Sequence, residues 1–503
     1  MEIYDIEKQK IEQEAILSDI QRYVEVDSLN EELHKVEFNL FRKLLKYGQS
    51  LLKEVIANHE TGEEERQIET SYEKTFSYYG KRSRSYLSIF GMLDIVRAYY
   101  RSSDGEGCCP LDSVLNLPEH RYSYLLQDWT ESKICETTYD TAIDDIFRIL
   151  DIKLPKRALE NAAVELTSDI DKFQFQKEAP PEESEGSVIC VTADCKGVRM
   201  VSAEKPKSAK SEETNDSPFA SKGNKRCGCR RDAVVTSDYS FIPKTRSPAE
   251  ISDALMKRFT SNDTSKSVKS NSIKKESQEE RKPLNKTTYA TMQGKSVAFV
   301  DMLDRVYNRD PTNSKPIYIL LDGAPSLKSG ICEEIRLRGW DNRIAGICLD
   351  IIHVSEYVWD AAKALFGDKK DKRIFWVGKT LRKILEGHVG HVIGGLRQRV
   401  KNGRLSAARK KVLKRVIVYF ENHRDMMKYN KYLSLGYSIA TGVIEGACGS
   451  LVKDRTDYSG MRWTEKGVQA VLDLRALKRN GDWDDYWKYH LKQEKQRLYK
   501  NVA

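Results

Sequence analysis

The sequence lacks the segments that a membrane-spanning or secreted protein needs. No apolar run among its 503 residues approaches the ~20 residues that a membrane-spanning helix requires. Its first ten residues carry mixed charge, whereas a signal peptide begins with a basic stretch followed by an apolar one. We therefore expect a cytoplasmic protein that does not enter a membrane.

Paired cysteines are also missing. The ten cysteines include no CxxC pair, which is the spacing that zinc ribbons use. The closest approaches are Cys108 beside Cys109, and Cys227 two residues before Cys229. A zinc ribbon is therefore not expected.

The chain does contain enough apolar residues to build folded domains. Hydrophobic residues make up 40% of it, which excludes a wholly disordered protein. At about 150 residues per domain, the length predicts about three domains. Two stretches, 203–226 and 261–286, are rich in Ser, Lys, Glu and Asn. Because they have almost nothing to bury, we predict flexible insertions within one domain.

The net charge of +9 is distributed very unevenly. Residues 1–70 hold 17 acidic and 9 basic side chains, whereas residues 361–420 hold 17 basic and 3 acidic ones. Apolar residues at helical spacing predict that the basic segment is helical. A solvated helix face is one interpretation, but such faces usually mix signs, and an excess of like charge repels itself. The pattern therefore favours a nucleic-acid partner.

The N-terminal third is predicted to be mostly helical. Residues 1–70 carry candidate buried positions at Leu40, Phe41, Leu44, Leu45, Leu51 and Leu52. Short strand-like runs follow at 76–79 and 86–89. Residues 138–150 and 155–166 then predict two helices with a brief turn between them, with Thr138 as a cap and Pro155 in a first turn. A helix-turn-helix would bring Lys156 and Arg157 into a DNA major groove; an ordinary helical hairpin is the alternative.

Two aspartates stand at the ends of apolar runs of strand length. Asp194 ends the run 188–194, and Asp322 ends the run 317–322. An acidic group at the end of a buried strand is costly unless it is solvated or binds something. Capping of a turn is the alternative for each. A third strand-like run ends at Asp350, and His353 follows three residues later. His353 either forms a functional pair with Asp350 or is an ordinary structural histidine.

Glu445 lies on a predicted helix beside an unusual glycine face. At 100° per residue, Gly442, Gly446 and Gly449 fall within one arc, with Glu445 at its edge and Lys453 on the same side. Each helical glycine costs about 1 kcal/mol relative to alanine. A face without side chains lets a sheet or a phosphate backbone approach closely. Tight helix-to-sheet packing explains the glycines but not Glu445.

Two strand aspartates and one helix glutamate are what a two-metal phosphoryl-transfer site needs. Carboxylate oxygens suit Mg²⁺ or Mn²⁺, and two ions about 4 Å apart can activate the attacking oxygen and stabilise the leaving one. We therefore expect Asp194, Asp322 and Glu445 to bind two such ions. Three tryptophans follow Glu445 in the sequence, and we expect them to lie in the core: Trp463, Trp483 and Trp487.

The C-terminal residues resemble a known family. Segments 441–455, 459–463, 472–476 and 480–484 closely resemble the insertion-sequence transposases of the ISKra group, which are DDE enzymes related to the Mutator-like set. Residues 321–323 and 349–353 are similar to that family's second acidic motif and its Asp-x-x-His signature. The similarity covers most of residues 75–490, and is loose in the N-terminal part.

The resemblance implies an α/β fold with an RNase H-like catalytic core split by an α-helical insertion. It assigns Asp194, Asp322 and Glu445 as the metal-binding triad, and Asp350 with His353 as the signature pair supporting the site. The implied enzyme binds terminal inverted repeats in double-stranded DNA, frees a 3′-OH and joins it to target DNA. It would act as a nucleoid-associated homo-oligomer. Cys195-Lys-Gly after Asp194 departs from the family pattern, in which glycine follows directly.

These expectations divide the chain into five parts. They are an acidic helical region 1–70, a helical DNA-binding region 71–175, a first core part 185–355, a basic helical insertion 356–436, and a completion of the core 437–503. The predicted nucleic-acid contacts are Lys156, Arg157, Arg397, Arg399, Arg409, Lys410, Lys414, Arg415, Lys453 and Arg455. The rival functions are another RNase H-like nuclease of resolvase type and a non-catalytic DNA-binding protein derived from a transposase.

Overall fold

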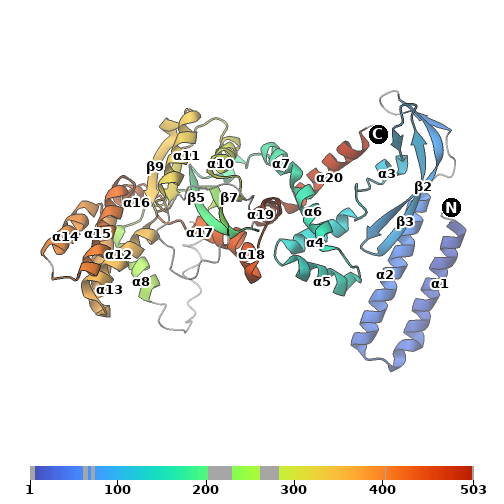
Figure 1. Ribbon diagram of the computed structural model, residues 1–503, viewed down its shortest axis with the longest axis horizontal. Helices are drawn as coiled ribbons and strands as arrows, with labels where there is room; N and C mark the ends of the chain where they lie inside the picture. Colours follow the sequence, from blue (N-terminus) through green and yellow to red (C-terminus); the bar gives the residue numbers. More distant parts are fainter. Residues whose placement is uncertain are drawn as a thin grey trace, which may run out of the picture. The chain divides into compact units, whose positions relative to one another are not determined.

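A computed structural model of the chain describes residues 6–59, 66–69, 74–201, 229–260, 283–402 and 404–500. It contains two compact units, an N-terminal unit of Met1–Phe173 with Gly481–Ala503, and a sheet unit of Gln174–Asn480 (Figure 1). The predicted flexible stretch 203–226 lies outside the described residues, as does most of 261–286. The last residues of the second stretch, 284–286, begin a strand. None of the described helices has the length and apolar character needed to cross a bilayer.

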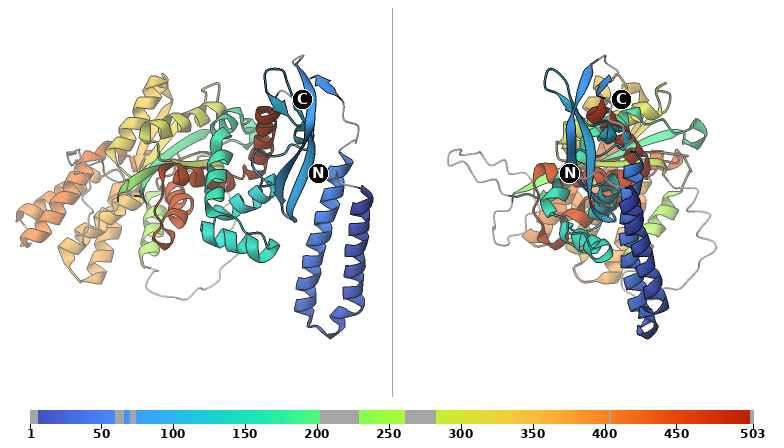
Figure 2. Two further views of the ribbon diagram at one scale, coloured as in Figure 1. Left: turned by 45° about the vertical axis from the view of Figure 1, so that its right-hand side comes forward. Right: turned by 90° about the vertical axis from the view of Figure 1, so that its right-hand side faces the viewer.

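The N-terminal unit begins with two antiparallel helices, α1 (Ile6–Glu25) and α2 (Leu33–Asn58), which confirm the predicted helical start (Figure 2). One face of α2 contacts α1, and another packs against the neighbouring sheet through Leu52 and Ile56. A third face is left over. The prediction that Phe41, Leu44 and Leu51 are buried is therefore wrong, since they are 40%, 50% and 40% exposed.

The sheet of this unit is antiparallel, in the order β1-β2-β3-β4. Its strands are β1 (Gln67–Glu69), β2 (Thr75–Ser88), β3 (Gly91–Arg101) and β4 (Gly107–Cys108). The two short predicted runs belong to the single long strand β2. Its register against β3 shifts between Tyr78 and Gly80, so a bulge interrupts it there.

Six further α-helices are described in the N-terminal unit. They are α3 (Pro110–Val114), α4 (Tyr124–Ile134), α5 (Tyr139–Leu150), α6 (Lys156–Leu166), α7 (Ile170–Gln176), which crosses into the sheet unit, and α20 (Trp483–Tyr499). The predicted cap is confirmed, because Thr138 Oγ1 accepts a hydrogen bond from Thr141 N–H at 3.0 Å. Pro155 is the residue before α6 and not part of its first turn. The predicted segment 437–503 is thus divided between the two units.

The sheet unit contains a five-stranded mixed sheet in the order β7-β6-β5-β8-β9. Its strands are β5 (Val188–Arg199), β6 (Arg230–Phe241), β7 (Leu284–Thr291), β8 (Ile317–Leu321) and β9 (Ile344–Leu349). The pairs β5–β6 and β6–β7 are antiparallel, whereas β5–β8 and β8–β9 are parallel. All five residues of β8 are buried, as expected for a strand covered on both faces. The predicted mixture of helix and sheet is confirmed.

Helices lie on both sides of this sheet. Figure 1 shows α10 (Lys295–Arg309) and α11 (Pro325–Leu337) above the strands, with α17 (Gly442–Ala447) and α18 (Asp454–Thr456) below them. Between α17 and α18 the chain forms a π-helix, η7 (Cys448–Lys453). The unit also contains α8 (Pro248–Thr260) and α19 (Glu465–Asn480). Trp463 and Trp487 are buried, as predicted for core tryptophans, and Trp483 is partly buried.

A block of helices separates β9 from α17. It consists of α12 (Ile351–Phe366), α13 (Lys370–Leu385), α14 (Val389–Asn402), α15 (Ala407–Asn422) and α16 (Tyr429–Ser434). The helices predicted from the apolar spacing of the basic segment are confirmed. Three of the residues that give this spacing, Val377, Leu381 and Ile384, are fully buried. These residues belong to the same hydrophobic core as the sheet. The helical block is therefore packed onto the sheet and does not form a core of its own.

Candidate active site at the carboxyl ends of the parallel strands

Three aspartates lie in a row across neighbouring strands. Val191 of β5 pairs with Ile319 of β8, and Leu321 of β8 pairs with Leu349 of β9. Asp322 and Asp350 each follow directly after the last pair of β8 and β9. Asp194 lies three residues beyond Val191, and its charge acts on Asp322. Ligand sites in sheets of this kind lie where the carboxyl ends of parallel strands meet.

Asp194 lies inside a strand, so the prediction that it ends one is wrong. Residues 195–199 continue β5 as an antiparallel arm with β6, in which Asp194 pairs with Val235. Only the parallel pairing with β8 stops before Asp194. The carboxylate of Asp194 accepts the Cys195 backbone N–H at 2.6 Å and the Cys448 thiol at 3.3 Å. These two bonds fix its orientation.

Asp322 follows directly after β8, as the sequence predicts. Its Oδ1 accepts the Ala324 N–H at 2.9 Å, and Gly323 turns the chain with a φ of 100°. Burial raises the pKa of the Asp322 carboxyl, and the negative charge of Asp194 raises it further. The charge of His353 acts in the opposite direction. Asp194 and His353 therefore both lie within electrostatic reach of Asp322.

Asp350 is completely buried at the start of α12. Its Oδ1 accepts the Ile352 N–H at 2.8 Å, which caps the helix, and its Oδ2 accepts the hydroxyl hydrogen of Thr441. Burial raises the pKa of the Asp350 carboxyl, and the nearby charge of Glu445 adds to this effect. Asp350 thus connects the end of β9 to the beginning of α17.

Asp350, His353 and Glu445 converge at ligand distance. One ligand atom from each lies within 4.8 Å of the other two, although Glu445 is about one hundred residues away in the sequence. Asp350 is buried, His353 is half-buried and Glu445 is exposed, so the cluster opens to solvent on the α17 side. Carboxylate oxygens with one imidazole suit a divalent cation such as Mn²⁺, and the carboxylates alone suit Mg²⁺.

The glycine face beside Glu445 is open. A Cβ atom added at Gly442, Gly446 or Gly449 would have no heavy atom within 4 Å, apart from the helix backbone itself. The interpretation that these glycines allow tight packing on the sheet is therefore wrong. The helix is also not regular, because α17 widens into the π-helix η7 after Ala447. Such π-helical segments occur frequently at functional sites.

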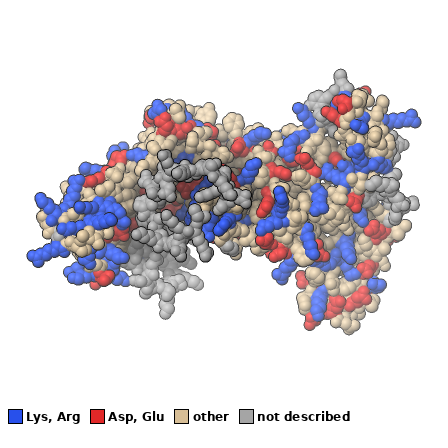
Figure 3. Space-filling model, in the orientation of Figure 1, with Lys and Arg blue, Asp and Glu red and all other residues tan. Residues whose placement is uncertain are grey.

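Basic side chains gather on the helical block. Figure 3 shows Lys and Arg concentrated at the end of the sheet unit where α13, α14 and α15 lie. Arg399, Arg409 and Lys414 are exposed there, whereas Arg397 pairs with Glu421 and Arg415 pairs with Asp360. Lys410 of the same block is half-buried. The predicted contacts Lys156, Arg157 and Lys453 lie outside the block and are exposed. Lys156 forms an ion pair with Asp140 at 3.0 Å.

Arg455 is the exception, and its predicted role as a nucleic-acid contact is wrong. Only 1% of it is exposed. Its guanidinium lies 4.7 Å from the centre of the Trp463 ring, and its Nη1 lies 3.2 Å from the Met461 sulfur. Trp463 is held in place by a bridge to Met200, the residue after β5. Arg455 therefore stabilises the turn after α18.

Three residues that support the site were not identified from the sequence. Cys448 and Thr441 bind the carboxylates of Asp194 and Asp350. His423, at the end of α15, lies 2.7 Å from the carbonyl oxygen of Gly323 through Nε2 and 2.7 Å from that of Tyr419 through Nδ1. It therefore holds the loop after Asp322 against the helical block. No sequence signal links it to a residue one hundred positions earlier.

Comparison with known proteins does not assign the chain to a family. No protein-family model matches it, and no curated protein matches it significantly. The geometry places Asp350, His353 and Glu445 within ligand distance of one another, and the charges of Asp194 and His353 act on Asp322 at the same edge of the mixed sheet.

Proposed function

We propose that this protein is a DDE transposase that cleaves DNA at the terminal inverted repeats of its own insertion sequence and joins the freed 3′ ends to target DNA. The observation that carries the proposal is the gathering of three aspartates of neighbouring strands and a helix glutamate at one edge of the sheet. The charge of Asp194 acts on Asp322, and Glu445 of α17 lies within ligand distance of Asp350 and His353. The sequence resemblance to ISKra-group transposases points to the same residues.

The architecture of the sheet unit supports an RNase H-like core. An antiparallel set, β7-β6-β5, continues into two parallel strands, β8 and β9, with helices on both faces. The helical block α12–α16 comes between Asp322 and Glu445 in the sequence, where the resemblance implies an insertion. We assign the unit to this superfamily as part of the proposal.

Two Mg²⁺ or Mn²⁺ ions fit the donor set. Asp194, Asp322 and Glu445 would hold them, and the ions would supply Lewis-acid stabilisation of the phosphoryl group. We assign Asp350 a positioning role, because its Oδ2 binds the Thr441 hydroxyl at the beginning of α17. His353, whose side chain is 36% exposed, lies beside it on the solvent side and is suited to contact a DNA phosphate.

The reaction has two phosphoryl transfers at one site. In the first, water attacks a phosphodiester at the end of the element, and the 3′ oxygen leaves as a free hydroxyl. In the second, that hydroxyl attacks a phosphodiester of the target and displaces its 3′ oxygen. The carboxylates would hold the metal ions, and the open face of Gly442, Gly446 and Gly449 would give the DNA backbone room to approach.

The test is cleavage and strand transfer in vitro. Full-length protein is incubated with Mg²⁺ or Mn²⁺ and DNA carrying the repeats that flank the encoding gene. We expect Asp322→Asn and Glu445→Gln to lose about two orders of magnitude or more of both activities. Asp341→Asn, an exposed carboxylate outside the site, is the matched control and should keep both.

Each rival function gives a different result in this experiment. A resolvase-type nuclease would cleave in a carboxylate-dependent way but transfer no strand. A non-catalytic DNA-binding protein would bind the repeats and cleave nothing. Equal cleavage by the wild type and both site variants would contradict the assignment of the site.

A further inference from the structure

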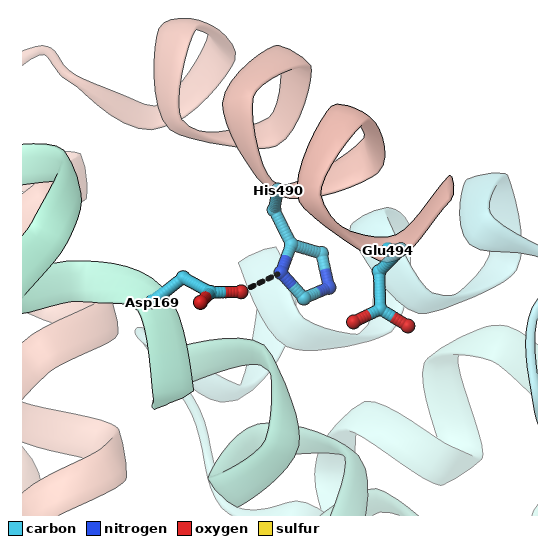
Figure 4. A group of neighbouring side chains, drawn as sticks. All are labelled: Asp169, His490 and Glu494. Atoms are coloured by element: carbon cyan, nitrogen blue, oxygen red, sulfur yellow. Dashed lines mark ion pairs between the residues drawn. The ribbon is translucent and has the colours of Figure 1, made fainter. Parts of the chain in front are cut away.

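The N-terminal unit contains a second cluster of metal-ligating side chains. Asp169 lies in the short 3₁₀ helix η2 (Thr167–Asp169), and His490 and Glu494 are one turn apart on α20. One ligand atom from each lies within 4.8 Å of the others. Figure 4 shows the imidazole of His490 between the two carboxylates. The three residues are only 7%, 4% and 5% exposed.

We propose that Asp169, His490 and Glu494 form a structural zinc site. The distance from His490 Nδ1 to Asp169 Oδ2 is 3.6 Å, which is too long for a hydrogen bond. Two ligands of a tetrahedral zinc ion with bonds of 2.0–2.1 Å lie about 3.3 Å apart. A small contraction would therefore turn this contact into a pair of zinc ligands.

The buried imidazole also supports the site, and its Nδ1 forms a long ion pair with Asp169 (Figure 4). Among the described residues, His490 Nδ1 has no hydrogen-bond partner, although the side chain is almost completely removed from solvent. Leaving such an atom unsatisfied is unfavourable. Its ring packs at right angles against Trp487, which fixes its direction. The nitrogen is thus held in place for a ligand that can accept its lone pair.

The charges around the cluster are of both signs. The charged groups that act on Glu494 are Arg497, Asp169, Glu119 and Glu165, so three of these four are carboxylates. Arg497 pairs with Glu494, but its side chain is 51% exposed. Lys172 lies 3.5 Å from Asp169, and its side chain is 68% exposed. Each carboxylate of the cluster therefore has one cation beside it, carried on an exposed side chain.

The donor set selects the metal. Mg²⁺ and Ca²⁺ prefer sites made only of oxygen ligands, whereas Zn²⁺ accepts imidazole nitrogen together with carboxylate oxygen. Zinc here would connect η2 to α20, two segments separated by more than three hundred residues. The site belongs to the N-terminal unit and does not depend on the function proposed for the sheet unit.

Zinc binding can be measured on the full-length protein after removal of metals by a chelator. All variants are made in an Asp322→Asn, Glu445→Gln background, so that the other carboxylate cluster contributes less. We expect calorimetric titration with ZnCl₂ to show one tightly bound zinc ion per chain. The affinity for this ion should fall at least about 100-fold in His490→Ala and in Glu494→Gln. His34→Ala removes an exposed histidine of α2 and should bind zinc as tightly as the parent protein.

Thermal unfolding gives a second measurement. Zinc should raise the Tm of the parent protein and of His34→Ala, but not that of His490→Ala or Glu494→Gln. If His490→Ala does not fold, Glu494→Gln decides the question, since glutamine keeps the shape of glutamate. Equal stoichiometry and an equal zinc-dependent rise in Tm for Glu494→Gln and the parent would overturn the proposal.

Discussion

Glu131 is a buried carboxylic acid in the N-terminal unit. It is 1% exposed, and within the described part of the chain neither of its carboxyl oxygens has a hydrogen-bond partner. Burial raises the pKa of Glu131 well above its usual value, because the charged form loses its hydration. The folded protein therefore keeps this proton at pH values where an unfolded chain has released it.

This residue predicts a pH-dependent stability. An acid whose pKa is raised by folding contributes stability that is fully present below the unfolded pKa of about 4.3 and is lost as the pH rises through the folded pKa. Glutamine cannot ionise, so Glu131→Gln should become increasingly more stable than the wild type as the pH rises above about 4.3. Urea unfolding of both proteins between pH 4.5 and 8 measures this difference.

The matched control for that series is Glu160→Gln, which changes an exposed glutamate on α6. It should follow the wild type at every pH. A constant difference between Glu131→Gln and the wild type over the whole range would show that Glu131 does not titrate abnormally.

Single residues of the active site were predictable where local sequence carries the signal. Asp322 follows an unbroken apolar strand and stops it, so its place at a strand end could be predicted. Asp194 could not be placed correctly, because β5 continues past the parallel part of the sheet as an arm paired only with β6. Cys448 and His423 reach the site through tertiary contacts, for which the sequence gives no local pattern.

At the scale of the element, α17 with η7 combines poor helix formers with open space. An alanine at Gly446 would have no neighbour within 4 Å outside its own helix. Gly446→Ala should therefore raise the free energy of unfolding by up to about 1 kcal/mol. If DNA approaches this face, the same change should reduce cleavage of repeat DNA. Urea unfolding and the cleavage assay on one preparation test both effects.

Gly378→Ala in α13 is the control for this prediction. Its added Cβ would meet Met256 at an ordinary contact distance of 3.6 Å. It should give a similar gain in stability without loss of cleavage. A stabilised and fully active Gly446→Ala would show that DNA does not use the glycine face.

Helices could be predicted from the sequence more reliably than the faces they bury. The apolar spacing of α2 is regular, but α2 packs against both α1 and the neighbouring sheet. The spacing therefore does not reveal that Phe41, Leu44 and Leu51 remain exposed. The same limit applies to Arg455, which was predicted from the sequence to be a nucleic-acid contact. The π-helical turns and the return of Trp463 bury it instead.

At the scale of the whole molecule, the excess of basic charge in residues 361–420 predicts a salt-dependent DNA affinity. Each phosphate contact that is lost should reduce the slope of log K against log salt by about 0.9. Arg399→Ala on α14 and Lys414→Ala on α15 remove exposed cations. We expect each to weaken binding to any duplex and to lower the slope by about 0.9, measured by fluorescence anisotropy between 50 and 200 mM salt.

Lys488→Ala serves as the comparison for these two variants. Lys488 is an exposed cation on α20, outside the basic helical block, and lies 3.2 Å from Asp485. It should leave the slope unchanged. Unchanged slopes for Arg399→Ala and Lys414→Ala would contradict a DNA-binding role for α14 and α15.

The mixture of helix and sheet, and the helical character of the basic block, could be predicted because apolar spacing is a local property. The division into units could not. Residues 481–503 follow directly after α19 of the sheet unit, yet the Tyr486 hydroxyl binds the Leu166 carbonyl, and Trp483 binds Asp128 in the N-terminal unit. Only tertiary structure reveals such a return of the chain.

This return has a consequence for biosynthesis. The N-terminal unit is made of two sequence segments, and its core includes Tyr486 of α20, which is fully buried. A ribosome must therefore translate the entire sheet unit before the N-terminal unit can close. Domains usually fold from the N-terminus as they emerge. Here the order of folding is reversed, because the sheet unit can complete its fold before α20, the last helix of the N-terminal unit, has been synthesised.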